Sequence, residues 1–151
     1  STNQQVDTGN WQPGHIHTAN CSGNQRLRIR SNATLQNGVI DTNCRITIGS
    51  GAVLEDILII SRNTGVTAID GSANVRLGAE DGCSAGGGVQ IVTQGGLQFA
   101  AGLTMYGVQI LAQGDIVLYR IVKKDGILRT NPIKPRSDFL VMFLMLVPSI
   151  K

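Results

Sequence analysis

The stretch Gly88-Val-Gln-Ile-Val-Thr-Gln-Gly-Gly-Leu-Gln-Phe99 returns nineteen positions later as Gly107-Val-Gln-Ile-Leu-Ala-Gln-Gly-Asp-Ile-Val-Leu118. The same nineteen-residue step carries Leu27-Arg-Ile29 onto Ile46-Thr-Ile48. Self-similarity at a period near twenty indicates a solenoid, in which each repeat forms one coil and stacks on the next. The repeat therefore predicts the architecture of the chain more directly than its chemistry.

Most of the repeated segments alternate apolar and polar residues, which is typical of half-buried β-strands. Turn-forming pairs such as Asn37-Gly38 and Asp70-Gly71 separate them. The sequence predicts an all-β, right-handed parallel β-helix of about five coils. Stacking at about 4.8 Å brings equivalent residues into apolar ladders inside the coils. The predicted pairs are Val89 with Val108, Ile91 with Ile110, and Leu97 with Ile116.

The coils are expected to end at Leu118, giving a capped solenoid over residues 1–118 and a separate tail over residues 119–151. Solenoids need capped ends, and the segment 1–23, with Trp11 and Ile16, is the candidate N-terminal cap. The tail contains one of the 19 glycines and all of the lysines. It is interpreted as a cap, a docking segment or a non-native extension. Its apolar run, residues 139–147, is too short to span a bilayer.

The charge of the chain is unevenly distributed. Residues 1–118 hold six arginines against eight acidic residues, whereas residues 119–151 hold seven basic residues against two acidic ones. The net charge of +3 therefore comes from the tail. The predicted solenoid lacks the broad basic surface that nucleic-acid binding requires, so we expect no nucleic-acid partner.

Three cysteines are present, without the spacing of a zinc site. Cys21 and Cys44 are 23 residues apart, close to one coil plus a few residues, so adjacent coils can place them side by side. They form either a disulfide, which implies an oxidising compartment, or, with Cys83, a set of buried thiols in a reduced protein. The glycine-rich loop around Cys83 is expected to bulge from one corner.

Motifs for catalysis or metal binding are incomplete. The nineteen-residue step places Glu55 over Gln36 and Asp56 over Asn37, so the stacking supplies neither a carboxylate pair for hydrolysis nor a calcium cluster. His15 and His17 lack a third ligand nearby. We therefore predict no catalytic, cofactor or metal site.

One candidate binding surface is basic. Arg26, Arg28 and Arg30 alternate with apolar residues and form a stripe on the outer face of an early strand. Such a stripe suits an anionic polysaccharide or an acidic protein, although a solvated face is the commoner explanation of alternating arginines. No ladder of threonine side chains is predicted from the repeat.

Residues 20–118 resemble the extracytoplasmic region of TadG-like proteins of Tad (Flp) pilus assembly, on the segments Cys21–Cys44, the Cys83 loop and Leu103–Ile116. The resemblance implies an exported, non-enzymatic role and a bond between Cys21 and Cys44. It also implies a later cysteine to partner Cys83 and an N-terminal membrane helix, and this sequence contains neither.

The sequence thus favours a structural or adhesive module of a bacterial envelope, secreted or periplasmic, linked to pilus assembly or surface attachment. Its expected partners are protein or glycan surfaces. Two alternatives remain open. The first is a β-helix carbohydrate-active enzyme, either a lyase or a hydrolase. The second is a solenoid that associates with itself, for example through the tail.

Overall fold

A computed structural model describes residues 4–80, 87–124, 127–133 and 140–144, with side chains as far as Tyr119. Every regular element in these ranges is a β-strand. The strands are β1 (Gln4–Val6), β2 (Ile16–Ala19), β3 (Arg26–Ile29), β4 (Thr34–Thr42), β5 (Arg45–Ile48), β6 (Val53–Ser61), β7 (Ile69–Gly71), β8 (Arg76–Leu77), β9 (Val89–Thr93), β10 (Leu97–Phe99), β11 (Thr104–Met105), β12 (Val108–Ala112), β13 (Ile116–Lys124), β14 (Ile127–Ile133) and β15 (Leu140–Leu144).

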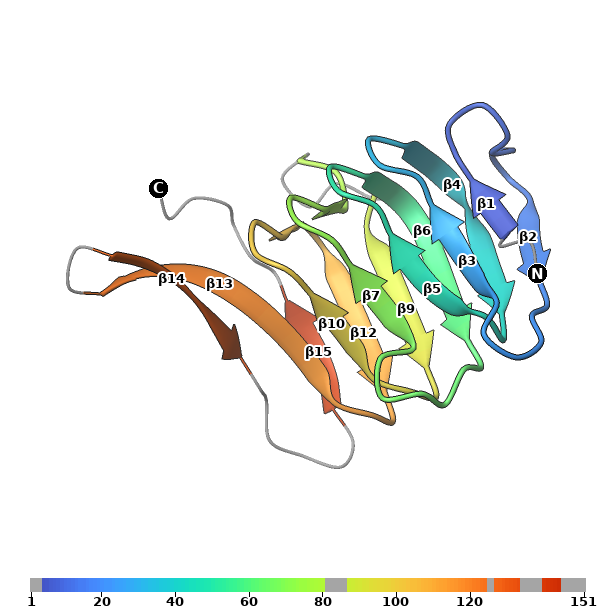
Figure 1. The fold of residues 1–151 in the computed structure, drawn as a ribbon. Helices are drawn as coiled ribbons and strands as arrows, with labels where there is room; N and C mark the ends of the chain where they lie inside the picture. The colour runs from blue at the N-terminus through green and yellow to red at the C-terminus, as the bar shows by residue number, and fades with distance from the viewer. Residues whose placement is uncertain (1–3, 81–86, 125–126, 134–139, 145–151) are drawn as a thin grey trace.

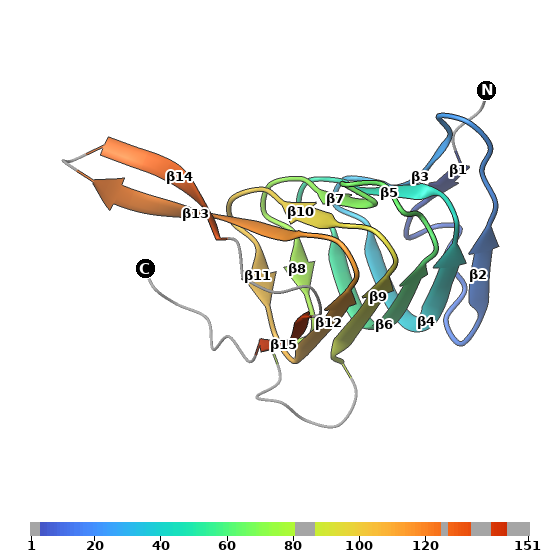
Figure 2. The same cartoon turned by 90° about the horizontal axis from the view of Figure 1, so that it is seen from below.

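The strands stack as a parallel β-solenoid of about five turns. One sheet, here called sheet A, has the order β1-β3-β5-β7-β10-β13-β14. The other, sheet B, contains β2, β4, β6, β9, β12 and β15, with the short strands β8 and β11 joined to the first half of β6. Figures 1 and 2 show the coils running from β1 and β2 at one end to β12 and β13 at the other. The predicted fold class is confirmed.

The nineteen-residue register is confirmed where the repeat is clearest. Val89 pairs with Val108, and Leu97 pairs with Ile116. Between the sheets, a continuous core of buried aliphatic side chains runs along the solenoid. These inward positions alternate with outward ones along each strand, as the pleat requires.

The third coil departs from the nineteen-residue step. Ile46 pairs with Ile69, and Ile69 pairs with Leu97, so the separations grow to 23 and 28 residues. The pattern of apolar and polar residues in Val66-Thr-Ala-Ile69 predicts a strand there. The structure begins β7 at Ile69 and leaves Val66 85% exposed, because the additional residues form a loop at the corner. Cys83 and residues 81–86 of its loop lie outside the described residues.

A column of hydroxyl side chains lies inside the solenoid, which corrects the expectation that no such ladder exists. Thr42 pairs with Ser61, and Ser61 pairs with Thr93. The Thr42 hydroxyl donates to the Ala19 carbonyl at 2.7 Å and accepts from the Cys44 amide at 2.9 Å. These bonds satisfy polar groups where the chain turns out of sheet B. The nineteen-residue step from Thr42 to Ser61 was the signal in the sequence.

The first coil is closed by residues ahead of β3. Trp11 is buried, and its indole Nε1 donates to the Gln36 carbonyl at 2.7 Å. Its ring lies against Gly38, where an added Cβ would be 2.4 Å from Trp11 Cζ2 and would therefore clash. Strands β1 and β2 extend the two sheets by pairing with β3 and β4.

At the other end, both sheets finish with antiparallel strands. Leu118, the expected end of the coils, lies inside β13, which continues to Lys124 and pairs with β14. In sheet B, β15 pairs with β12. Figure 1 shows β13 and β14 extending beyond the coils as a two-stranded ribbon. Among the described residues, no helix is long and apolar enough to cross a membrane.

Candidate binding groove

The predicted arginine stripe lies on the outer side of sheet A. Arg28 is exposed and lies between Gln5 and Thr47 in the register. Arg26 is half-buried, in register with Arg45. Arg30 forms an ion pair with Asp7, with an N–O distance of 3.4 Å, so part of the stripe's charge is compensated.

Asp7 is held in its charged form. The Asn10 backbone N–H donates to its carboxylate, as does that of Gly9, and Arg30 adds an opposite charge. These contacts outweigh the cost of desolvation and keep the pKa of Asp7 below its ordinary value of 3.8.

Three other carboxylates of the coils also face an arginine on the neighbouring coil. Asp70 pairs with Arg45 at 3.2 Å, Asp41 pairs with Arg62, and Glu55 pairs with Arg76. Glu55 also accepts a hydrogen bond of 2.5 Å from Gln36, the neighbour predicted by the nineteen-residue step. These contacts join neighbouring coils on the outside of the solenoid.

The two histidines do not converge on a shared site. His15 is exposed, whereas His17 lies beside Trp11, with ring centroids 6.0 Å apart. Within the part of the chain that the structure describes, no three residues of the types His, Cys, Asp and Glu gather where they could hold a metal ion.

Cys21 and Cys44 form a disulfide between adjacent coils. Asn43 reinforces the same corner, because its side-chain oxygen accepts from the Cys21 amide at 2.7 Å and its nitrogen donates to the Cys21 carbonyl at 3.3 Å. The bond and the two hydrogen bonds fix the chain entering β3 to the chain entering β5.

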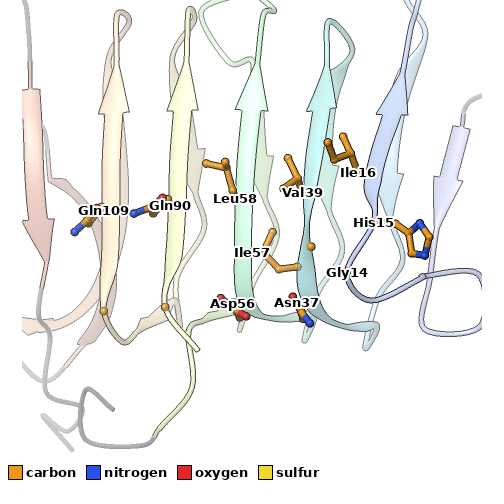
Figure 3. A pocket seen from close by; sticks show the side chains of 13 residues that line it. Gly14, His15, Ile16, Asn37, Val39, Asp56, Ile57, Leu58, Gln90 and Gln109 are labelled. Carbon is orange, nitrogen blue, oxygen red and sulfur yellow. Dashed lines mark hydrogen bonds between the residues drawn. The ribbon is translucent and has the colours of Figure 1, made fainter. Parts of the chain in front are cut away.

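A groove of about 470 Å³ crosses the strands of sheet B at the level where β4 and β6 bend, and sequence reasoning missed it. We call it the corner groove. It takes residues from five successive levels (Figure 3): Gly14–Ile16, Asn37–Val39, Asp56–Leu58, Gly88 with Gln90, and Gly107 with Gln109.

The corner itself is shaped by the residues that stand just before the paired positions 38, 57, 89 and 108. Asn37 and Asp56 have left-handed backbones, with φ of 52° and 53°, and bend β4 and β6 there. The last two levels have Gly88 and Gly107 instead. A Cβ at Gly88 would be 2.7 Å from the Gly107 carbonyl oxygen, so the two coils approach closely there. Because neither glycine has a side chain, the corner stays open at these two levels.

The adjoining wall of the corner groove changes from aliphatic to amide along the solenoid. In register, Ile16, Val39 and Leu58 are followed by Gln90 and Gln109. Gln90 Nε2 donates to Gln109 Oε1 at 3.0 Å, which aligns the two amides (Figure 3). Among the residues that the structure describes, no arginine or lysine lines the groove, and Asp56 is its only carboxylate.

Beside this wall, the outer surface of sheet B stays apolar. Ile60, Val92 and Leu111 are in register on successive strands, and the last two are 40% and 43% exposed. Contiguous exposed apolar surface marks interaction sites more often than isolated residues do. The signal in the sequence was the outward positions of residues 53–61, where Leu58 and Ile60 stand at places that alternation reserves for polar side chains.

The comparisons with known proteins bear on the family of the chain. No curated protein and no solved structure gives a match. The sequence profile of a family described as a domain of unknown function (DUF7867) matches residues 1–127. Because this match spans most of the 151 residues, the chain belongs to the DUF7867 family.

Proposed function

We propose that the protein is a non-enzymatic structural or adhesive module of a bacterial cell envelope that attaches through the outer face of sheet B. The observation that carries the proposal is the surface of that face, where the corner groove and the aliphatic residues Ile60, Val92 and Leu111 lie side by side across successive coils. A rigid parallel sheet presents such a surface without ordering a loop, which limits the entropic cost of binding.

The proposed location is secreted or periplasmic. The Cys21–Cys44 disulfide supports it, because such bonds persist in oxidising compartments and are rare in reducing ones. A role in pilus assembly or surface attachment follows from the resemblance to TadG-like proteins, and its partners are protein or glycan surfaces.

The carbohydrate-active enzyme is less well supported. Hydrolysis of glycosidic bonds uses two carboxyl groups flanking the substrate, whereas Asp7, Asp41, Glu55 and Asp70 each face an arginine. Among the described residues that line the corner groove, Asp56 is the one carboxylate. A binding role makes use of the groove without a second carboxylate.

Attachment of protein-coated beads tests the proposal. Beads carrying the full chain are expected to bind bacterial cells and isolated envelopes, and the double variant Leu58→Glu/Leu111→Glu is expected to reduce binding at least about tenfold. The control Gln5→Glu/Gln98→Glu adds the same charge to outward positions of sheet A and should leave binding unchanged. Equal attachment by both variants, or none by the wild type, contradicts the proposal. Release of reducing ends from a polysaccharide panel would instead support the enzyme.

A further inference from the structure

We infer that the corner groove binds a neutral polysaccharide chain that lies along the solenoid axis. The inference rests on the proposed attachment through sheet B and specifies its ligand. The groove runs across five levels of the solenoid rather than along one strand. A ligand that fills it therefore meets each coil in turn, which suits an extended polymer.

The polar groups of the groove recur with the coils. Successive coils lie about 4.8 Å apart, and Gln90 and Gln109 present amides at the same position of two neighbouring coils. Their mutual hydrogen bond uses one amide hydrogen and one oxygen lone pair, which leaves further donors and acceptors on both side chains. Paired amides of this kind match the hydroxyl groups of a sugar, each of which donates and accepts.

The aliphatic half of the wall matches the other surface of a sugar. A pyranose ring carries C–H groups on its faces and hydroxyls around its rim. Ile16, Val39 and Leu58 offer a continuous apolar surface for such a face. Asn37 and Asp56, at the adjacent corner, lie where rim hydroxyls can reach them. The wall thus combines apolar contact with a few placed polar groups, as small-molecule sites commonly do.

The charge of the groove selects against polyanions. Among the described residues, no arginine or lysine lines it, His15 contributes an imidazole at one end, and Asp56 adds a negative charge. A nucleic acid or an acidic polysaccharide would meet repulsion without compensation. An extended peptide has no free edge to pair with at β4, β6 or β9, because each of these strands is paired on both sides. A neutral glycan needs neither cations nor a sheet edge.

Titration of the full chain with neutral and acidic oligosaccharides of matched length tests the inference. The neutral probes are β-linked hexamers of glucose and of N-acetylglucosamine, and the acidic probe is a galacturonate hexamer. Isothermal titration calorimetry is expected to detect a neutral hexamer and no galacturonate. The double variant Gln90→Ala/Gln109→Ala should weaken binding at least about tenfold, since it removes several hydrogen bonds.

The matched control is Gln94→Ala/Gln113→Ala. These two glutamines are also exposed and nineteen residues apart, but they follow the other ends of β9 and β12, away from the groove. This control should change the Kd less than about twofold.

A second variant fills the groove instead of removing contacts. Gly107 has φ of 58°, and a Cβ there would meet its nearest atom at 3.7 Å, so Gly107→Asn is expected to fold as Asn37 does at its own level. Its side chain should occupy the corner of the groove at this level and change the affinity for the neutral hexamer.

Unchanged affinity in the Gln90→Ala/Gln109→Ala and Gly107→Asn proteins, or a preference for galacturonate, overturns the inference. If no neutral glycan binds while bead attachment still depends on Leu58 and Leu111, the ligand is wrong and the proposed function stands. If bead attachment fails as well, both proposals fall.

Discussion

Phe99 fills the space left by the missing side chain of Gly71 in the neighbouring coil. The two residues are in register, as are Ile48 with Gly71 and Phe99 with Leu118. A Cβ on Gly71 would be 2.1 Å from Phe99 Cδ1. A large and a small residue therefore share one level of a core that is mostly aliphatic.

We predict that Gly71→Ala destabilises the protein by about 1–3 kcal/mol, because the added methyl group overpacks the core. Phe99→Leu should reduce the effect of Gly71→Ala, since the smaller side chain makes room for the methyl group. Urea denaturation of both single variants and the double variant measures the coupling. Additive losses would show that the two residues do not compete for this space.

The carboxylate of Asp7 makes the folding stability of the protein depend on pH at acidic values. Its pKa is lower in the folded protein than its ordinary value of 3.8. The stabilisation is therefore fully present above the ordinary pKa and is lost as the pH falls through the lower, folded value. Asp7→Asn keeps an oxygen that can accept from Gly9 and Asn10 but removes the charge. The difference in unfolding midpoint between wild type and Asp7→Asn should persist above pH 3.8 and shrink below it. A difference that grows on acidification would contradict this assignment.

Contacts between side chains of neighbouring coils were predictable from the sequence where the nineteen-residue step holds. Gln36 and Glu55 were expected to stack, and they form a hydrogen bond. The contact of Gly71 with Phe99 was not predictable, because their 28-residue separation includes the irregular third coil. The ion pairs were also missed, since separations such as 21 residues between Asp41 and Arg62 place side chains diagonally across the repeat.

At the scale of elements, the two longest parallel neighbours, β4 and β6, carry much of the candidate site. Each contains one residue with left-handed φ, Asn37 or Asp56, which turns the strand at the groove. The nineteen-residue step predicted that Glu55 lies over Gln36 and Asp56 over Asn37, but it predicted neither the extent of these strands nor the groove, because apolar–polar alternation assumes that outward positions are polar. Leu58 and Ile60 point outward although they are apolar, so alternation does not predict the surface that they form.

The disulfide joins the segments that enter β3 and β5. In the chain-entropy description, a loop of 23 residues makes its cross-link worth about 3 kcal/mol. We predict that Cys21→Ser/Cys44→Ser, made in a Cys83→Ser background, lowers the free energy of unfolding by about that amount. Guanidinium denaturation measures it.

The reductant supplies the control for the disulfide. Reductant should destabilise the Cys83→Ser protein to the level of the triple variant and leave the triple variant unchanged. If reductant has no effect on the Cys83→Ser protein, the bond contributes nothing to stability.

At the scale of the whole molecule, both sheets end in an antiparallel strand. At the C-terminal end, β14 covers β13 and β15 covers β12 by antiparallel pairing. Uncovered strand edges pair readily with other chains. The change in composition predicts a boundary at Leu118. The parallel pairing of β13 with β10 ends at this residue, and the strand itself continues to Lys124 in its pairing with β14.

We predict that a chain ending at Leu118 associates with itself more strongly than the full chain, because it lacks β14 and β15. Light scattering over a concentration series, with both chains under the same conditions, measures this. The opposite result, association only of the full chain, would indicate that the tail is an oligomerisation segment.

The disulfide also decides how the solenoid responds to tension. An adhesive module transmits force along its chain, and a solenoid pulled from its N-terminus yields its coils one after another. Between Cys21 and Cys44 the covalent bond carries the load, so β3 and β4 lie in a closed ring that force does not lengthen. While the bond is intact, those 23 residues cannot be pulled out, which shortens the extended chain by about 80 Å. Reduction of the disulfide makes this length available. In the proposed adhesive role, the oxidised protein is therefore a shorter and stiffer tether, and the redox state of one bond determines how far its attachment point can move before the coil of β5 and β6 opens.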